Sequence, residues 1–186
     1  MDQNNCKIDL PTIETERFVL RRVNEEDKAD IFDILSDKNV IENLNMEVHN
    51  NIEDTIRMIQ NYLEGLKKRE KYPYAIIDKI SNEFIGVFLI KLDIFDEDSF
   101  EFTVYIKKEF WNKGIYTEVL KHMTKFAFEY IQTGNFRGFV MEKNEASSRV
   151  LEKNNFKLEK IFEVNGIEGK IKSYLITKDE FKNFAS

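Results

Sequence analysis

The alternation of apolar and polar residues along the chain predicts both strands and helices. Seven short stretches, apolar-rich and bounded by polar or turn residues, are typical of strands. They are Arg17–Val23, Tyr74–Asp78, Phe84–Leu92, Ser99–Ile106, Gly138–Glu142, Lys157–Val164 and Ile171–Thr177. Short polar connections separate the second, third and fourth stretches, so we expect an antiparallel meander there.

Apolar residues that recur every three or four positions predict four helices. The helices should run from Asn24 to about Ser36, from Asn51 to about Arg69, from Lys113 to Ile131 and from about Ala146 to Asn154. Asn24 with Asp27, and Asn51 with Asp54, are typical of a capped helix start with an acidic first turn. One apolar stripe marks the second helix and consists of Ile56, Ile59, Leu63 and Leu66.

In order along the chain these elements are β-α-α-β-β-β-α-β-α-β-β. This order predicts an α+β, or mixed α/β, fold with a single central sheet and helices on its faces. The 186 residues contain no internal repeat and no Gly/Ser/Pro-rich linker, and they suffice for one core but are short for two. We therefore expect a single domain with its core between about Ile13 and Phe181.

Charge narrows the classes of function only slightly. The 28 Lys and Arg against 34 Asp and Glu give a net charge of −6. Such a chain would have to overcome phosphate repulsion to bind nucleic acid, so we expect no nucleic-acid partner. An amine substrate or a cationic partner fits this sign better, although many soluble proteins are equally acidic.

Cysteine and targeting signals give further expectations. Cys6 is the one cysteine, so neither an intrachain disulfide nor a Cys-based metal site is expected, and the two histidines are far apart in the sequence. No apolar run approaches the ~18 residues that span a bilayer. The first ten residues lack a basic segment followed by an apolar one, so we expect no signal peptide, no membrane partner and a cytoplasmic protein.

Two segments carry candidate chemistry. In Lys108–Leu120 a strand ends in a turn with Gly114 and a helix begins at once, and the unpaired N–H groups of a helix start can hold a phosphate. An ordinary strand-to-helix connection is the alternative. In Asn144–Phe156, Asn144 or Ser147 can cap a helix and do nothing more, and Asn155 suits the helix exit because asparagine tolerates the left-handed conformation.

Taken together, these segments resemble the GNAT superfamily of N-acetyltransferases, and within it the RimJ/RimL-type branch, which acetylates ribosomal-protein N-termini and related amines. The resemblance rests on WNKGIYTEVL, followed further along the chain by NxxSxxVLEKxxF. ETERFVLRRV, FIGVFLI, EFTVYI and SYLIT extend it over nearly the whole chain.

The resemblance implies that acetyl-CoA is the co-substrate. It implies a sheet that splays between the fourth and fifth predicted strands, Ser99–Ile106 and Gly138–Glu142, to admit the pantetheine arm of the cofactor. The pyrophosphate would lie on the backbone amides of Asn112, Lys113, Gly114, Ile115, Tyr116 and Thr117. Relatives usually have glycine at position 112 and a small residue at position 116, and an inward-pointing Tyr116 would crowd the cofactor.

The resemblance also implies catalytic roles. Glu101 matches a glutamate that relatives often use as general base, sometimes through water; a surface carboxylate is the alternative. Strand alternation places Glu101, Thr103 and Tyr105 on the substrate side, and Phe102, Val104 and Ile106 in the core.

Backbone N–H groups near Val104 and Tyr105 would stabilise the carbonyl oxygen, and Ile106 would complete the part of this strand that binds the cofactor. Asn144 matches an asparagine that binds the pantetheine arm. Ser147 matches a serine that protonates the leaving thiolate, unless it only caps its helix.

The acceptor stays open among a protein N-terminus and small amines such as a polyamine, an amino sugar or an antibiotic. Glu42, Glu47 and His49 could meet a cationic substrate, with a solvated loop as the alternative. We expect direct attack by the amine and no covalent intermediate on Cys6. A non-catalytic GNAT-fold module that binds a ligand or a protein is the alternative function, motivated by Asn112 and Tyr116. Both a monomer and a homodimer are compatible with the sequence.

Overall fold

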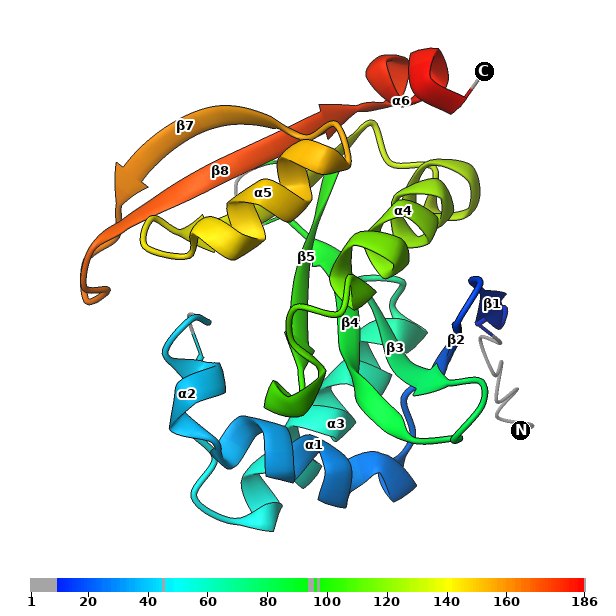
Figure 1. The fold of residues 1–186 in the computed structure, drawn as a ribbon, viewed down its shortest axis with the longest axis vertical. Helices are drawn as coiled ribbons and strands as arrows, with labels where there is room; N and C mark the ends of the chain where they lie inside the picture. Colours follow the sequence, from blue (N-terminus) through cyan, green and yellow to red (C-terminus); the bar gives the residue numbers. More distant parts are fainter. Residues whose placement is uncertain (1–9, 45, 94–95, 97, 186) are drawn as a thin grey trace, which may run out of the picture.

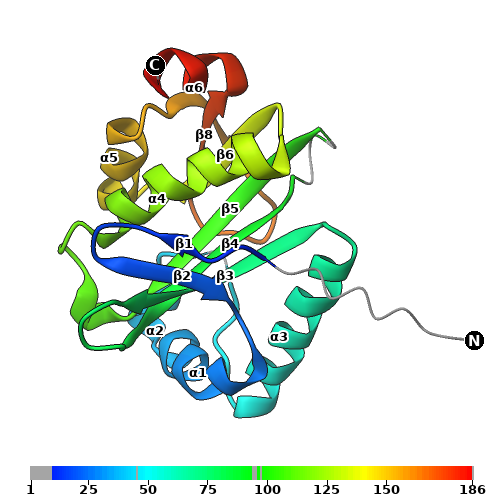
Figure 2. The ribbon, with the colours of Figure 1, turned by 90° about the vertical axis from the view of Figure 1, so that its right-hand side faces the viewer.

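The computed structural model describes residues 10–44, 46–93, 96 and 98–185. In this part of the chain eight strands form one sheet in the order β1-β2-β3-β4-β5-β6-β8-β7 (Figures 1 and 2). The strands are β1 (Ile13–Glu14), β2 (Phe18–Arg22), β3 (Lys71–Asp78), β4 (Phe84–Leu92), β5 (Ser99–Ile106), β6 (Asn135–Met141), β7 (Lys157–Glu163) and β8 (Lys170–Thr177). Neighbouring strands are antiparallel except β5 and β6, which are parallel. The predicted mixed sheet and its central meander are thereby confirmed.

Helices cover both faces of this sheet. They are α1 (Lys28–Ser36), α2 (Lys38–Ile41), α3 (Ile52–Lys67), α4 (Ile115–Phe126), α5 (Glu145–Lys153) and α6 (Lys178–Ala185), with a π-helical turn over Ala127–Ile131. Residues of α4 and α5 pack in one hydrophobic core, and residues of α1, α2 and α3 pack in a second one. Figure 2 shows the two groups of helices on opposite sides of the strands. None of the described helices has the length and apolar character needed to cross a membrane.

Both predicted helix starts are confirmed by reciprocal caps. The side chain of Asn24 accepts a hydrogen bond from a first-turn backbone N–H, and Asp27 bonds back to the backbone of Asn24. Asn51 and Asp54 form the same arrangement at α3. In a capping box each side chain satisfies a backbone donor that the helix itself leaves unpaired. These local pairs therefore specify where each helix begins.

Some element boundaries differ from the prediction. β3 and β6 each begin three residues earlier than expected. The start of β3 was missed because Pro73 indicates a break in a helix, whereas here it lies within the strand and its carbonyl accepts a hydrogen bond from Val23 at 3.0 Å. β1 and α2 are too short to show a period, and α6, which was not predicted, crosses the expected end of the core at Phe181.

The apolar stripe of α3 is also displaced from the predicted one. Ile59 and Leu66 are buried as expected, but Ile56 and Leu63 are only half-buried. Thr55, Tyr62 and Gly65 take their places in the interior. The predicted stripe contained only the most apolar residues. It missed this shift of the buried face around the helix axis because the buried face of a helix can also contain small or polar residues.

The sheet splits between β5 and β6, as predicted. Their pairing extends only from Ser99 with Asn135 to Phe102 with Gly138. Beyond that point β5 continues beside β4 to Ile106, and β6 continues beside β8. In Figure 1 the strands around β5 and those around β8 diverge, with α2 and α5 on either side of the opening. The split leaves one edge of β5 without a neighbouring strand.

Gly86 is required where β4 approaches β5, and replacing it should destabilise the fold. A β-carbon at position 86 would meet the backbone carbonyl of Tyr105. We predict that Gly86→Ala lowers the free energy of unfolding by about 1–3 kcal/mol, because the two strands would have to separate. Gly134→Ala is the matched control, since a β-carbon there meets its nearest atom at 3.8 Å. Urea denaturation of both variants tests this, and equal stabilities would contradict it.

Candidate functional site

Two clefts meet where the sheet splits. The first cleft has a volume of about 470 Å³ and is lined mainly by the end of β5, the loop before α4 and the first turns of α5. The second cleft, of about 460 Å³, runs over β4, β5 and β6 towards the β7–β8 hairpin. Six residues line both clefts: Asn43, Leu44, Val104, Tyr116, Asn144 and Ser147. The opening can therefore hold a ligand at each end and let the two ligands meet.

The loop before α4 has a backbone shape that the sequence alone only partly indicated. Asn112 and Gly114 have φ angles of 60° and 73°, both in the left-handed region. All six residues from Asn112 to Thr117 line the first cleft. Asparagine is one of the few residues besides glycine that adopt this conformation at low cost. Asn112 is therefore compatible with a loop in which relatives usually have glycine, and Asn155, with a φ of 66°, fits its helix exit in the same way.

Side chains from distant parts of the chain hold this loop in place. The guanidinium of Arg17 donates to the carbonyl of Lys113 at 3.0 Å and forms an ion pair with Glu118 at 2.7 Å. Burial alone would raise the pKa of Glu118, but hydrogen bonds from Thr15 and Arg17 outweigh it and hold this pKa below its usual value. On the other side of the loop, the indole of Trp111 donates to the carbonyl of Ile106 at 3.0 Å. The loop is therefore tied to the residue just before β2 and to the last residue of β5.

The charged side chains that line the first cleft are all cationic among the described residues. They are Lys113 from the loop and Arg149 and Lys153 from α5. The whole chain carries a net charge of −6, so this local excess is opposite to the overall sign. Our sequence analysis missed Arg149 and Lys153. Their spacing of four residues, which places both on one helix face, is the signal that could have found them.

The open edge of β5 presents backbone groups to the clefts. The N–H of Lys107 donates to the carbonyl of Ile85 on β4 at 2.9 Å. Because the direction of backbone groups alternates along an antiparallel strand, the N–H of Tyr105 also points towards β4, and those of Val104 and Ile106 point towards the split. Val104 therefore remains a candidate donor, whereas the backbone N–H of Tyr105 does not.

The predicted faces of β5 are correct except for two side chains, Val104 and Tyr105. Val104 was expected in the core, but it is half-buried, packs only against the edge of the core with α4 and lines both clefts. Phe102 and Ile106 are buried in the core with α4, and Glu101 and Thr103 line the second cleft. The ring of Tyr105 is 2% exposed and lies in the core formed with α1, α2 and α3. The alternation was right, but α3 covers this part of the face, so Tyr105 is a core residue there.

Tyr116 does not close the opening. It packs against the core beside α4, and what remains exposed of it borders both clefts. Burial raises the pKa of its hydroxyl. The side chain thus contributes to the core and to the wall of the clefts, and both clefts are present beside it.

The sequence left open whether Asn144 or Ser147 caps helix α5, and the structure shows that Asn144 does so. Asn144 caps α5, and its side-chain oxygen accepts from the backbone N–H of Ser147 at 3.1 Å. The NH₂ group of the same side chain donates to no acceptor among the described residues, so it can donate to a ligand. The hydroxyl of Ser147 is not the cap, and Ser147 lines both clefts. Both residues thus lie at the junction of the clefts.

Glu101 is buried, so its interpretation as a surface carboxylate is wrong. It is 6% exposed and borders the second cleft. Its Oε1 lies 2.7 Å from the ammonium of Lys91, and its Oε2 has no hydrogen-bond partner among the described residues. Burial raises the pKa of this carboxyl group, although the neighbouring Lys91 partly offsets the effect. A buried carboxylate with one free oxygen is well suited to accept a proton.

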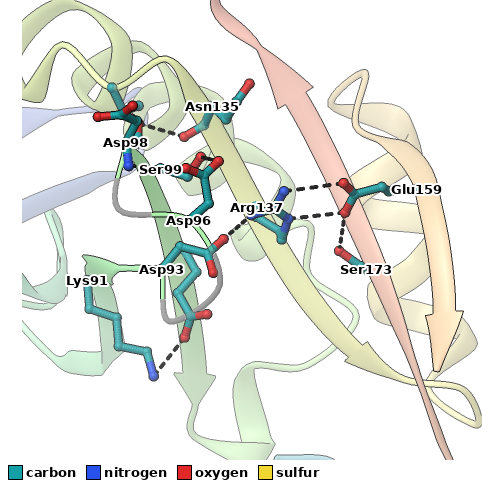
Figure 3. Close-up of polar contacts among 11 residues, drawn as sticks. Lys91, Asp93, Asp96, Asp98, Ser99, Asn135, Arg137, Glu159 and Ser173 are labelled. Carbon is teal, nitrogen blue, oxygen red and sulfur yellow. Dashed lines mark hydrogen bonds and ion pairs between the residues drawn. The ribbon is translucent and has the colours of Figure 1, made fainter. Parts of the chain in front are cut away.

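Arg137 joins the two halves of the sheet at the point where they begin to diverge (Figure 3). Its guanidinium contacts Asp93, which follows β4, and forms an ion pair with Glu159 of β7 at 3.2 Å. The hydroxyl of Ser173 donates to Glu159 at 2.8 Å. Arg137 is 7% exposed. Its charge is thus balanced by two carboxylates, and the cluster holds the base of the split together.

The other residues considered from the sequence lie elsewhere. Glu42 forms an ion pair with Lys143 at 3.2 Å, and His49 contacts the hydroxyl of Thr55 at 2.8 Å. Neither they nor Glu47 line a described cleft. Cys6 lies outside the described residues. In the part of the chain that the structure describes, no three His, Cys, Asp or Glu side chains are grouped to hold a metal ion.

Comparisons with known proteins agree with this geometry. The sequence pattern of the family described as "Acetyltransferase (GNAT) domain" matches residues 17–157. The uncharacterized N-acetyltransferase YoaA of Bacillus subtilis is 27% identical over 150 residues, which cover 81% of this chain and 85% of the relative.

Two solved structures share the fold. RimL, a ribosomal alpha-N-protein acetyltransferase in complex with coenzyme A, has a TM-score of 0.79 at 19% identity, over 91% of this chain and 99% of that chain. A spermidine N-acetyltransferase from Vibrio cholerae, in complex with CoA and spermine, has a TM-score of 0.77 at 17% identity, over 90% and 99% of the two chains.

The left-handed backbone at position 112 makes a prediction about stability. Asn112→Gly should leave the free energy of unfolding unchanged to within about 0.5 kcal/mol, whereas Asn112→Val should lower it by about 1–2 kcal/mol, because a β-branched residue is strained there. Lys113→Val is the control, since residue 113 is not in the left-handed region. Urea denaturation is the measurement, and a stable Asn112→Val variant would show that the loop has another shape.

Proposed function

This chain belongs to the GNAT acetyltransferase family, and we propose that it transfers the acetyl group of acetyl-CoA directly to a primary amine. The observation that carries this proposal is the pair of clefts that meet beside Glu101 and Ser147 at the split in the sheet. In our proposal the first cleft binds the cofactor and the second cleft binds the amine. The acceptor is a protein N-terminus or a small-molecule amine.

The residues of the first cleft fit a cofactor of this kind. Coenzyme A carries phosphate groups, and the cleft is lined by three cations, the start of α4 and a loop with two left-handed residues. Helix starts and such loops direct backbone N–H groups at anions. We assign the pyrophosphate to the loop from Asn112 to Thr117. The amide of Asn144 and the open edge of β5 at Val104 and Ile106 would hold the pantetheine arm.

Glu101 would prepare the acceptor. An aliphatic amine is mostly protonated at neutral pH and must lose a proton before it can attack. Oε2 of Glu101 is buried and has no hydrogen-bond partner among the described residues, and in our proposal it accepts that proton, directly or through a water molecule, once the amine enters the cleft. Its negative charge also favours the entry of an ammonium group into a cleft that otherwise contains Lys71 and Lys91.

Backbone and hydroxyl groups would assist the transfer itself. Acetyl-CoA supplies an activated acyl group in the form of a thioester. The amine nitrogen attacks the carbonyl carbon, a C–N bond forms, the C–S bond breaks, and the thiolate leaves with its electron pair. The N–H of Val104 would donate to the developing oxyanion, and the hydroxyl of Ser147 would pass a proton to the sulfur. The nitrogen loses two protons overall. The first leaves to solvent through Glu101, and the second, released once the C–N bond has formed, replaces the proton that Ser147 gave to the sulfur.

Acetyl-CoA binding and turnover test this proposal directly. Calorimetry should detect acetyl-CoA binding, and the release of free thiol should then depend on an added amine. Binding that persists without thiol release for any class of amine would favour the non-catalytic module instead. An absence of binding at millimolar acetyl-CoA would overturn the assignment of the first cleft.

The role of Glu101 makes a prediction about pH. Glu101→Gln should lower kcat/KM by about 10²–10⁴-fold, because an amide cannot accept the proton. In the wild type, kcat/KM should fall as the pH drops and Glu101 becomes protonated. Since burial raises this pKa, the fall should begin at a higher pH than an ordinary glutamate would give.

Glu42→Gln is the matched control, because Glu42 is an exposed carboxylate that lines neither cleft. Its pH profile should equal that of the wild type. If Glu101→Gln keeps the acidic limb of the profile, Glu101 is not the base.

A further inference from the structure

Charged residues form a row across the sheet on the side of α3. Lys71 of β3 lies directly opposite Lys91 of β4, and Lys91 lies directly opposite Glu101 of β5. Like charges at directly opposite positions of neighbouring strands destabilise a sheet. Burial and the neighbouring Lys91 lower the pKa of Lys71. Lys91 has Glu101 as its partner, so the position of the second cation, Lys71, is not explained by the stability of the sheet.

The fold makes room for Lys71 in a specific way. Its aliphatic stem crosses α3 at Gly65, where a β-carbon would lie 2.6 Å from the Cδ of Lys71. Its ammonium donates to the side-chain oxygen of Asn61, one helical turn away. A glycine inside a helix is unfavourable unless something requires it. Helix α3 thus has no side chain at the point where the stem of Lys71 crosses it. The space at Gly65 and the contact with Asn61 keep Lys71 beside the second cleft.

The second cleft surrounds Lys71, Lys91 and Glu101 with mostly apolar side chains. Its charged side chains, among the described residues, are Lys71, Lys91 and Glu101, two cations against one anion. Most of the other lining residues are apolar, including Met46, Met58, Leu89, Phe139, Phe162 and Ile171. In such a weakly polar cleft an uncompensated charge is costly. A polyamine would bring further cations to the two lysines.

We propose that the acceptor of this acetyltransferase is an amine that also carries an anionic group, with the amine at Glu101 and the carboxylate or phosphate at Lys71. Neighbouring strands lie roughly 4.8 Å apart, so the backbone positions of Lys71 and Glu101 are separated by about 10 Å. An amino terminus followed by an acidic residue spans this range, and so does a small amino acid with a distal acid group. The inference rests on the proposed function and names its substrate class.

Matched peptides test this inference. Three amidated tripeptides that differ only in a central aspartate, asparagine or lysine are compared as acceptors, with spermidine and a free dicarboxylic amino acid as small-molecule acceptors. The wild type should favour the aspartate peptide over the asparagine peptide in kcat/KM by about tenfold, as expected for one charge-assisted contact. The lysine peptide and spermidine should be poorer. Comparing the amino acid with the aspartate peptide shows whether the anion comes from a small molecule or from a peptide.

Variants of Lys71 connect the preference to this residue. Lys71→Met keeps the stem over Gly65 and should abolish the preference for aspartate, mainly through KM. Lys71→Arg should retain the preference, and Lys71→Glu should transfer it to the lysine peptide. Lys67→Met is the control, because Lys67 is an exposed lysine of the same helix that lines neither cleft.

The results of these assays distinguish a failure of the proposed acceptor class from a failure of the proposed acetyl transfer. Thiol release with no charge preference, or a preference that survives Lys71→Met, overturns this inference alone. Faster turnover of spermidine than of the aspartate peptide does the same. If no amine supports thiol release, the proposed function fails and this inference fails with it.

Discussion

The separation of β5 from β6 is the constraint on which the site depends. The two strands pair for only four residues, and Gly138 lies at the last rung, where a β-carbon would be 2.8 Å from the ring of Phe102. Just before that rung Arg137 contacts Asp93 on one side and Glu159 on the other. Close packing and paired charges hold the base of the split together while its open end is free to admit ligands. Both clefts, the unpaired edge at Val104 and the position of Glu101 follow from this one feature.

The two ends of the opening differ in charge from the rest of the molecule. The chain has a net charge of −6, yet its first cleft is lined by three cations and its second by two cations and one anion. Like charges gathered in one cleft repel one another, so ligands of opposite charge would relieve that repulsion. Overall charge is therefore a poor guide to the ligands of this protein. The sign of each cleft is set by a few side chains that the fold brings together.

In the loop before α4, asparagine adopts a left-handed backbone conformation at a position where relatives usually have glycine. Asn112 adopts a left-handed conformation that glycine would adopt more easily. Contacts of Arg17, Glu118 and Trp111 tie the loop to the start of β2 and the end of β5. These ties come from residues far apart in the sequence. The loop conformation is thus fixed by contacts within the chain, and a preorganised loop binds a ligand more effectively than one that must first be ordered.

Local patterns in the sequence were sufficient for most of the fold. The capped helix starts at Asn24 and Asn51, the apolar run Phe84–Leu92 and the order of elements depend on neighbours within a few residues, so the chain itself specifies them. The motifs at residues 111–120 and 144–156 indicated the family and hence the split in the sheet. Short elements such as β1 and α2 were missed because they contain too few residues to show a period.

Only the tertiary structure decided which side chains meet. The burial of Glu101 beside Lys91, the cations of α5 at the first cleft, the Tyr105 ring in the core under α3 and the stem of Lys71 over Gly65 each join separate elements. Such contacts depend on strand register and on how helices lie across the sheet, and neither is encoded in a local pattern. Periodicity states which face a residue occupies, but packing between elements decides whether that face borders a ligand or the core.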